Sequence, residues 1–187
     1  MPHNRRKQHL WYPMRIAYGR DERVLRLKSH LDQEGIENFL PMRYKYTKTE
    51  QWDVEKELIP AIHGLIFIHS SQEKLTELKM TRREFEPLHY MTNQLAEDGN
   101  TPLLTVPQKQ MTDFMRVASI QDERFIYMEN LAFVAKPGKR VRITDGQFKG
   151  VEGVIKRIKK SQCVVVQVEG VAAIALTFVP TAWLEDL

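Results

Sequence analysis

The distribution of hydrophobic residues predicts a sheet organised around one central strand. Residues 62–68 read Ile-His-Gly-Leu-Ile-Phe-Ile, so four consecutive apolar residues follow a His-Gly pair. A short run of branched and aromatic residues behind a glycine is typical of a strand that is buried on both faces. Further strands are expected at residues 11–18, 36–46, 85–94 and 102–106. Both faces of the central strand must be covered by other side chains. The function depends on whether this chain supplies all of that cover or a partner protein supplies part of it.

Three helices are predicted from apolar residues that recur every three or four positions. The first covers residues 20–35, the second covers residues 71–80 behind a serine that can cap it, and the third covers residues 107–119. Strands and helices thus alternate along residues 11–119. This pattern predicts an antiparallel sheet with helices packed on it.

A long hairpin is predicted just before the central strand. Residues 43–46 read Arg-Tyr-Lys-Tyr, and after a polar turn residues 52–58 return toward the central strand. In a two-stranded ribbon this alternation puts the charges on one face and the rings on the other. Such side chains bind single-stranded nucleic acid, and they also keep an exposed hairpin soluble. The sequence leaves both interpretations open.

The C-terminal part has a different pattern. Residues 136–187 contain five short apolar stretches separated by turn residues such as Asp145-Gly146 and Glu169-Gly170. Short strands at close spacing predict a small five-stranded barrel, in which no edge is left unpaired. We also expect a disordered tail at residues 1–10 and a linker at residues 120–135. The expected fold class is α+β, with a helix-flanked antiparallel sheet joined to a small β-barrel.

Charge is distributed unevenly along the 187 residues. The formal net charge is +4, and residues 136–187 account for it with nine Lys and Arg against five Asp and Glu. A mildly basic small domain is compatible with nucleic acid or with an acidic protein surface. The first helix carries a basic stripe, which is either a solvated face or an edge that faces phosphates. The stripe consists of Arg20, Arg23, Arg26 and His30.

The sequence carries no recognisable catalytic or metal-binding pattern. Its single cysteine, Cys163, excludes an intramolecular disulfide and a cysteine-based zinc site, and its six histidines show no metal-ligand spacing. His63 has no nucleophile at a recognisable spacing, and there is no phosphate-binding glycine loop. We therefore expect a protein that is not an enzyme and needs no cofactor or metal. The lone cysteine, the absence of a long apolar run and the polar N-terminus lead us to expect a cytoplasmic protein. We expect it to act as a monomer.

Two stretches resemble the domains of a known family. Residues 141–154 closely resemble the KOW motif, in which a glycine at the position of Gly150 follows a turn and leads into a strand. Upstream, Trp11-Tyr12 before a helix, residues 37–41 and the hairpin into residues 60–68 are similar to the amino-terminal (NGN) domain of NusG. This order, over nearly the whole chain, resembles the NusG family of transcription elongation factors.

The resemblance is closer to a specialised paralogue than to housekeeping NusG. His63-Gly64-Leu65 stands where NusG usually has Pro-Gly-Tyr, and residues 164–171 and 178–180 are similar to the UpxY-type, RfaH-like antiterminators of capsular polysaccharide operons. The resemblance implies an NGN domain at residues 11–119 and a KOW domain at residues 136–187. It also implies a role in processive elongation or antitermination of a specific operon.

In this family the NGN domain lays an apolar depression on the clamp-helix coiled coil of the β′ subunit of RNA polymerase. The resemblance therefore implies that residues 62–67 form an open apolar ridge, which the polymerase helices complete. The positions that match this contact are Arg15, Phe39, Pro41, Ile62, Leu65 and Phe67.

The resemblance implies two further contacts. In specialised paralogues the basic first helix faces the non-template DNA strand, which assigns the four residues of the basic stripe to DNA. The family's KOW domain binds a small-subunit ribosomal protein, or Rho in NusG itself, around a turn that matches Phe148 and Lys149. For Phe148, a place in the barrel core is the alternative.

A second function stays open at this point, a KOW-type ribosome- or RNA-binding protein without polymerase contact. It predicts tight binding of ribosomal RNA through the basic residues 136–160, with a sharp dependence on salt. Some members of the family also refold the KOW domain into helices. The β-branched run Val164–Val166 favours strands, so we expect the β form here.

Overall fold

The computed structural model describes residues 7–48, 53–92, 102–129 and 138–187. These residues form two compact units, each made from two stretches of chain. The first unit contains the described residues up to Leu40 and from 63 to 107, and the second contains those from 41 to 62 and from 108 to 187. Among the residues described, no helix is long and apolar enough to cross a membrane. Residues 1–6 of the predicted tail lie outside the description.

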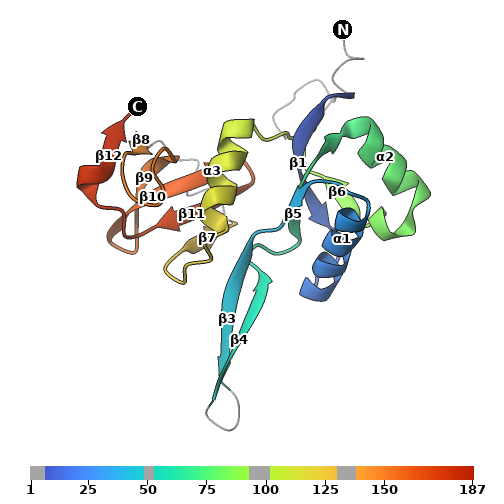
Figure 1. The fold of residues 1–187 in the computed structure, drawn as a ribbon, viewed down its shortest axis with the longest axis horizontal. Helices are drawn as coiled ribbons and strands as arrows, with labels where there is room; N and C mark the ends of the chain where they lie inside the picture. The colour runs from blue at the N-terminus through green and yellow to red at the C-terminus, as the bar shows by residue number, and fades with distance from the viewer. Residues whose placement is uncertain (1–6, 49–52, 93–101, 130–137) are drawn as a thin grey trace. The chain divides into compact units, whose positions relative to one another are not determined.

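The first unit is built on a four-stranded sheet with the order β2-β5-β1-β6, in which every pairing is antiparallel (Figure 1). Its strands are β1 (His9–Ile16), β2 (Asn38–Phe39), β5 (Leu65–Ser71) and β6 (Leu88–Tyr90). β5 lies between β2 and β1, and its first four side chains are fully buried. The predicted central strand, buried on both faces, is confirmed.

Two helices of the first unit, α1 (Asp21–Gln33) and α2 (Gln72–Thr81), lie on the same side of this sheet (Figure 1). The chain leaves α1 through Gly35, whose φ of +66° is the left-handed conformation expected at a glycine stop. The Ser71 hydroxyl accepts a hydrogen bond from the backbone N–H of Lys74 at 3.2 Å. Ser71 is therefore the N-cap of α2, as predicted. The 3₁₀ turn η2 (Arg83–Phe85) follows.

The second unit contains the predicted hairpin, formed by β3 (Met42–Lys48) and β4 (Val54–Pro60). Seven antiparallel pairs join the two strands, from Met42 opposite Pro60 to Lys48 opposite Val54. The strand predicted at residues 36–46 is thus two strands, β2 and β3. They are separated at Leu40-Pro41, where proline has no N–H to donate to a continuous ladder.

The described C-terminal residues form a six-stranded antiparallel sheet with the order β12-β8-β9-β10-β11-β7. Its strands are β7 (Ile126–Met128), β8 (Arg140–Ile143), β9 (Glu152–Ile158), β10 (Ser161–Val168), β11 (Ala172–Leu176) and β12 (Leu184–Asp186). The five strands predicted within residues 136–187 are present as β8 to β12. The sixth strand, β7, was not predicted; it comes from the predicted linker and pairs with β11. An unpaired strand edge can pair with any extended segment that reaches it. β7 has only three residues, which are too few to show a strand periodicity in the sequence.

The helix α3 (Gln108–Ala118) lies against β10 and β11. Its buried apolar residues Met111, Phe114 and Val117 have the predicted helical spacing. The alternation of strands and helices over residues 11–119 predicts that this helix packs on the first sheet, whereas the structure groups it with the second unit. The spacing of apolar residues indicates that one face of a helix is buried, but it does not indicate which sheet buries that face. The boundaries of the NGN and KOW domains remain predictions.

Residues 138–187 are strands and turns, with the 3₁₀ turn η3 (Thr181–Trp183) before β12. The β-branched run Val164–Val166 lies inside β10 and is buried. The predicted β character of the C-terminal part is confirmed.

Candidate functional site

Two backbone segments meet at the start of α1. The N–H of Ile16, the last residue of β1, donates to the carbonyl of Gly64 at 2.8 Å. The Arg15 guanidinium donates to the carbonyl of His63 at 2.6 Å. Gly64 has a φ of +59°, and its backbone is in contact with that of Gly19. The His63-Gly64 turn is thereby fixed beside the loop that leads from β1 into α1.

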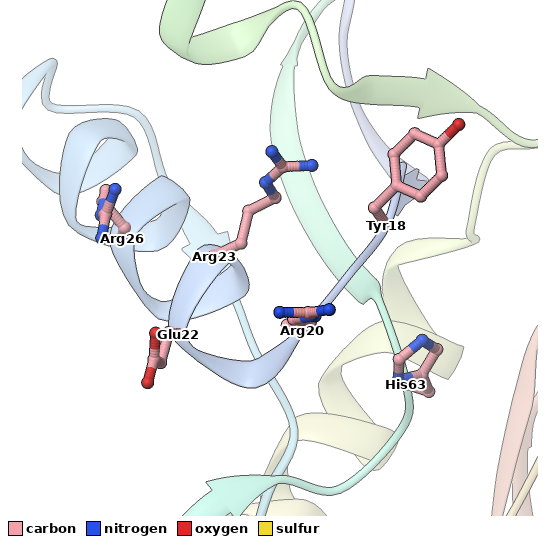
Figure 2. Close-up of a pocket in the computed structure, with 6 residues that line it drawn as sticks. All are labelled: Tyr18, Arg20, Glu22, Arg23, Arg26 and His63. Carbon is pink, nitrogen blue, oxygen red and sulfur yellow. The ribbon is translucent and has the colours of Figure 1, made fainter.

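A hollow of about 610 Å³ opens at this junction (Figure 2). Such a volume is ordinary for a small-ligand cleft, which spans roughly 300–1,000 Å³. The side chains that line it come from the β1–α1 loop, the first turns of α1 and the His63-Gly64 turn. They are Tyr18, Arg20, Glu22, Arg23, Arg26 and His63.

The hollow is electropositive, because three arginines and only one carboxylate, Glu22, line it. Within the described part of the chain, no carboxylate forms an ion pair with Arg20, Arg23 or Arg26, although Glu22 also lines the hollow. Lys28, on the same helix, instead forms an ion pair with Asp32 at 2.9 Å. Three guanidinium groups around one hollow with a single carboxylate favour an anionic ligand.

The structure divides the predicted basic stripe. Arg20, Arg23 and Arg26 come together at the hollow. His30 does not, because its ring packs edge-on against Phe85 with the centroids 6.4 Å apart. Its assignment to the same DNA-facing edge is not supported by this placement, because His30 lies one turn further along α1, beyond the hollow, with its ring packed on Phe85.

Tyr18 and His63 line the hollow as well, although no sequence pattern predicts them there. Tyr18 is 89% exposed and has a φ of +51°. The hydrophobic pattern does not predict this exposure, because Tyr18 comes two residues after the end of β1 and its aromatic side chain fits the pattern of that strand. His63 joins the site only through the long-range contact of two loops.

The predicted polymerase-binding residues of the first unit share one face of its sheet. Arg15 lies opposite Leu65, and Phe39 lies opposite Phe67. Directly opposed residues of an antiparallel pair point to the same face, and residues two apart on a strand do so too. These four side chains are therefore grouped. Pro41 and Ile62 belong to the second unit.

The expectation of an open apolar ridge at residues 62–67 is wrong. Ile62, Leu65 and Phe67 are each 0% exposed, and Pro41 is also buried. Burying such side chains gains about 25 cal/mol per Å² of apolar surface, so a strand that is apolar on both faces is stable only when both are covered. Arg15 and Phe39 keep partial exposure. They are the members of the set that can touch a partner directly.

The turn matched to the KOW partner site has a buried aromatic residue. Phe148 is 3% exposed, and its ring centroid lies 6.0 Å from that of Phe125 and 6.4 Å from that of Phe178. Its predicted role as a surface contact is therefore corrected to the alternative, a core residue. The side chain of Lys149 is exposed, as a contact residue requires.

α3 holds the backbone of this turn with polar side chains. The Arg116 guanidinium donates to the carbonyls of Gln147 and Lys149, at 2.7 Å each. Lys109 donates to the carbonyl of Gly150 at 3.1 Å, and the carboxylate of Asp113 accepts from the N–H of Glu152 at 3.1 Å. These bonds explain why α3 carries a buried aspartate in an apolar face.

Several basic residues of the C-terminal stretch are paired with acids. Lys139 lies 2.7 Å from Asp186, and Arg142 lies 2.9 Å from Glu152. The hydrogen bond from Arg142 lowers the pKa of the Glu152 carboxyl. Arg140 is 3.6 Å from the same carboxylate. This part of the surface is less positive than the sequence suggests.

Nothing in the described ranges resembles a metal centre. No group of three or more His, Cys, Asp or Glu side chains in these ranges could hold an ion. Cys163 is buried, and burial raises the pKa of its thiol, which makes it a packing residue.

Comparison with known proteins identifies one motif. Residues 137–169 match the KOW motif, a stretch that contains β8, β9 and β10. No curated protein matches the chain. Among solved structures, the chain is similar to NusG from Thermotoga maritima, in a structure concerned with its domain interaction. The two share 17% identity over 96% of this chain and 98% of that one, with a TM-score of 0.46.

Proposed function

We propose that this protein is a non-catalytic transcription factor of the NusG type, which binds RNA polymerase and promotes processive elongation or antitermination of a specific operon, such as one for capsular polysaccharide. The observation that carries the proposal is the KOW motif at residues 137–169, behind a unit with a helix-flanked antiparallel sheet. The resemblance of residues 11–68 to an NGN domain supports it. The operon specificity follows from the UpxY-like features of the sequence.

The polymerase surface of this proposal is the sheet face that carries Arg15, Phe39, Leu65 and Phe67. Phe39 and Arg15 are its accessible members and contact the β′ clamp helices. Leu65 and Phe67 are buried, and they act by positioning the side chains of Arg15 and Phe39. A coiled coil laid on this face buries the remaining apolar surface of Phe39, which is the helix-in-groove mode of recognition.

Two further contacts belong to the proposal. The hollow lined by Arg20, Arg23 and Arg26 faces the non-template DNA strand. The KOW domain binds a small-subunit ribosomal protein or Rho, with Lys149 as the exposed side chain of its turn.

A pull-down with core RNA polymerase tests the proposal. We expect the wild type to retain polymerase and Phe39→Asp to lose it, because a charge on a half-buried apolar contact is costly to desolvate. Met80→Asp is the matched control, since Met80 is 82% exposed on α2 and lies outside the proposed surface. Circular dichroism establishes that both variants are folded.

The alternative is a ribosome- or RNA-binding protein without polymerase contact. The ion pairs of Lys139, Arg140 and Arg142 weaken it, because paired side chains release fewer counterions from RNA. A wild-type protein that captures ribosomal RNA at physiological salt, and no polymerase, would overturn the proposed function in its favour.

A further inference from the structure

We infer that the turn between β9 and β10 contacts the phosphate backbone of a nucleic-acid duplex through Arg157, Lys159 and Lys160. The inference goes beyond the proposed function, which assigns nucleic acid only to the hollow of the first unit. It places a separate site in the second unit, which carries the KOW motif, and it names paired strands as the ligand.

The turn has a backbone that lysine rarely adopts. Ile158 and Ser161 form the last antiparallel pair of β9 and β10, so only Lys159 and Lys160 lie between the strands. Their φ angles are +47° and +70°. A two-residue hairpin loop with both φ angles positive is a type I′ turn, for which Asn-Gly is the preferred sequence. A lysine in this left-handed region costs stability that asparagine or glycine largely avoids. Folding alone thus favours Asn-Gly here, and residues kept against such a preference point to a function.

The cations of this hairpin are exposed and keep their charge. From residue 153 to residue 168 the chain contains four Lys and Arg and no Asp or Glu. Arg157, Lys159 and Lys160 are all exposed, and within the described ranges no carboxylate forms an ion pair with any of the three. Lys139 and Arg140 differ in this respect, because they are paired with Asp186 and Glu152.

The neighbours of the lysines favour phosphates over a protein partner or an unpaired base. Ser161 and Gln162 are polar and exposed, and Gln162 lies opposite Arg157, so their side chains share one face of the hairpin. Protein interfaces are anchored by aromatic and apolar side chains, and unpaired bases stack on aromatic rings. Residues 157–162 include no aromatic residue, and their one apolar residue, Ile158, is partly buried. Cationic and hydrogen-bonding side chains of this kind contact phosphates, which a duplex presents at roughly one charge per 1.7 Å of its axis.

The test replaces the two lysines by the sequence that their backbone prefers. The full chain is titrated with a short labelled DNA duplex at several salt concentrations, and binding is followed by fluorescence anisotropy. Lys159→Asn combined with Lys160→Gly should weaken binding and lower the slope of log affinity against log salt by about two, one for each lost phosphate contact. The melting temperature of this double variant should equal or exceed that of the wild type, because Asn-Gly fits the turn.

Lys139→Gln combined with Arg140→Gln is the matched control. It removes the same two charges from the same unit, but from residues that are already paired with acids, so it should keep the wild-type slope. An RNA duplex of the same sequence is the second probe, and a lower slope for the Asn-Gly variant on either duplex supports the inference. The probe with the larger change identifies the ligand as DNA or RNA.

Three results would overturn the inference. The first is that the Asn-Gly variant and the control have equal slopes on both duplexes. The second is that the Asn-Gly variant loses more affinity for labelled polyglutamate than for either duplex, which would indicate an acidic protein partner. The third is that the Asn-Gly variant melts below the wild type, which would give the lysines a structural role. The titration contains no polymerase, and every variant keeps the hollow at the start of α1. Its outcome is therefore independent of the pull-down that tests the proposed function.

Discussion

A Cβ atom added to Gly19 would lie only 2.7 Å from the Cα atom of Gly64. Real Cβ atoms do not approach a backbone so closely, so the β1–α1 loop and the His63-Gly64 turn touch only because residue 19 is a glycine, while Gly64 supplies the left-handed φ of +59° that the turn needs. This contact puts His63 beside Arg20 and Tyr18. The hollow at the start of α1 is therefore built on a glycine–glycine contact between segments that are far apart in the chain.

Gly19→Ala should open this junction. The added methyl group has backbone on two sides, Gly64 Cα at 2.7 Å and the Ile16 carbonyl at 3.0 Å, and neither can move without shifting β1. We expect the free energy of unfolding to fall by about 1–3 kcal/mol, as for other overpacked sites, and the affinity of the hollow for DNA to fall with it. Urea denaturation measures the first effect. Ser29→Ala, on the exposed face of α1, should change stability by no more than about 0.5 kcal/mol.

Arg20→Gln should reduce the salt dependence of DNA binding. If Arg20 contacts a phosphate, its loss lowers the slope of log affinity against log salt by about one. Lys28→Gln makes the same change of charge on the same helix, but Lys28 is paired with Asp32. Its slope should match the wild type. Equal slopes for the two variants would mean that the arginine is not a phosphate contact.

Phe148→Ala should destabilise the second unit, whereas Lys149→Ala should not. The Phe148 ring is buried against both Phe125 and Phe178, and truncation of a buried phenylalanine costs about 3–5 kcal/mol. Lys149 is exposed, so its truncation should cost less than about 0.5 kcal/mol. Chemical denaturation of both variants separates a core role from a surface role. A Phe148→Ala protein as stable as wild type would restore Phe148 as a surface contact.

Arg116→Ala should loosen the turn at residues 147–150. The substitution removes two hydrogen bonds to backbone carbonyls, and in this exposed position we expect a loss of about 1 kcal/mol. Hydrogen exchange of the Lys149 and Gly150 amides should become faster. Arg116→Lys keeps the charge but not the two-pronged geometry, so it should rescue only part of the protection. Unchanged exchange in Arg116→Ala would show that α3 does not hold the turn.

Tyr127 should titrate later than an ordinary tyrosine. Burial raises the pKa of its phenol to about 12, against a smaller opposing effect of Arg43, and its hydroxyl donates to the Met42 carbonyl at 3.2 Å. A pKa that is higher in the folded than in the unfolded chain contributes stability that is complete below pH ~10 and is lost as the pH rises toward 12. Phenolate absorbance should show this late step in wild type, and Tyr127→Phe should lack it. A wild-type titration without the step would contradict the burial of this phenol.

The sequence by itself determined the elements whose signals are local. The end of α1 at Gly35 and the start of α2 at Ser71 can each be predicted from one or two residues, because capping acts within a single helical turn. The central strand and β10 follow from short runs of branched apolar residues. Such a run is a property of the strand's own sequence and needs no distant contact to be recognised. Three of the four residues in the basic stripe could also be placed together, since residues three apart share a helix edge.

Only the tertiary structure decided what each element meets. Whether Leu65 and Phe67 are open or covered, which sheet receives α3, and where the short β7 pairs all depend on contacts between distant segments, which no local period encodes. The same holds for Tyr18, which continues the pattern of β1 in the sequence but stands exposed beside three arginines in the fold. Burial and register are settled by the free energy of the whole packed chain, and the candidate site exists only where two distant loops are brought together.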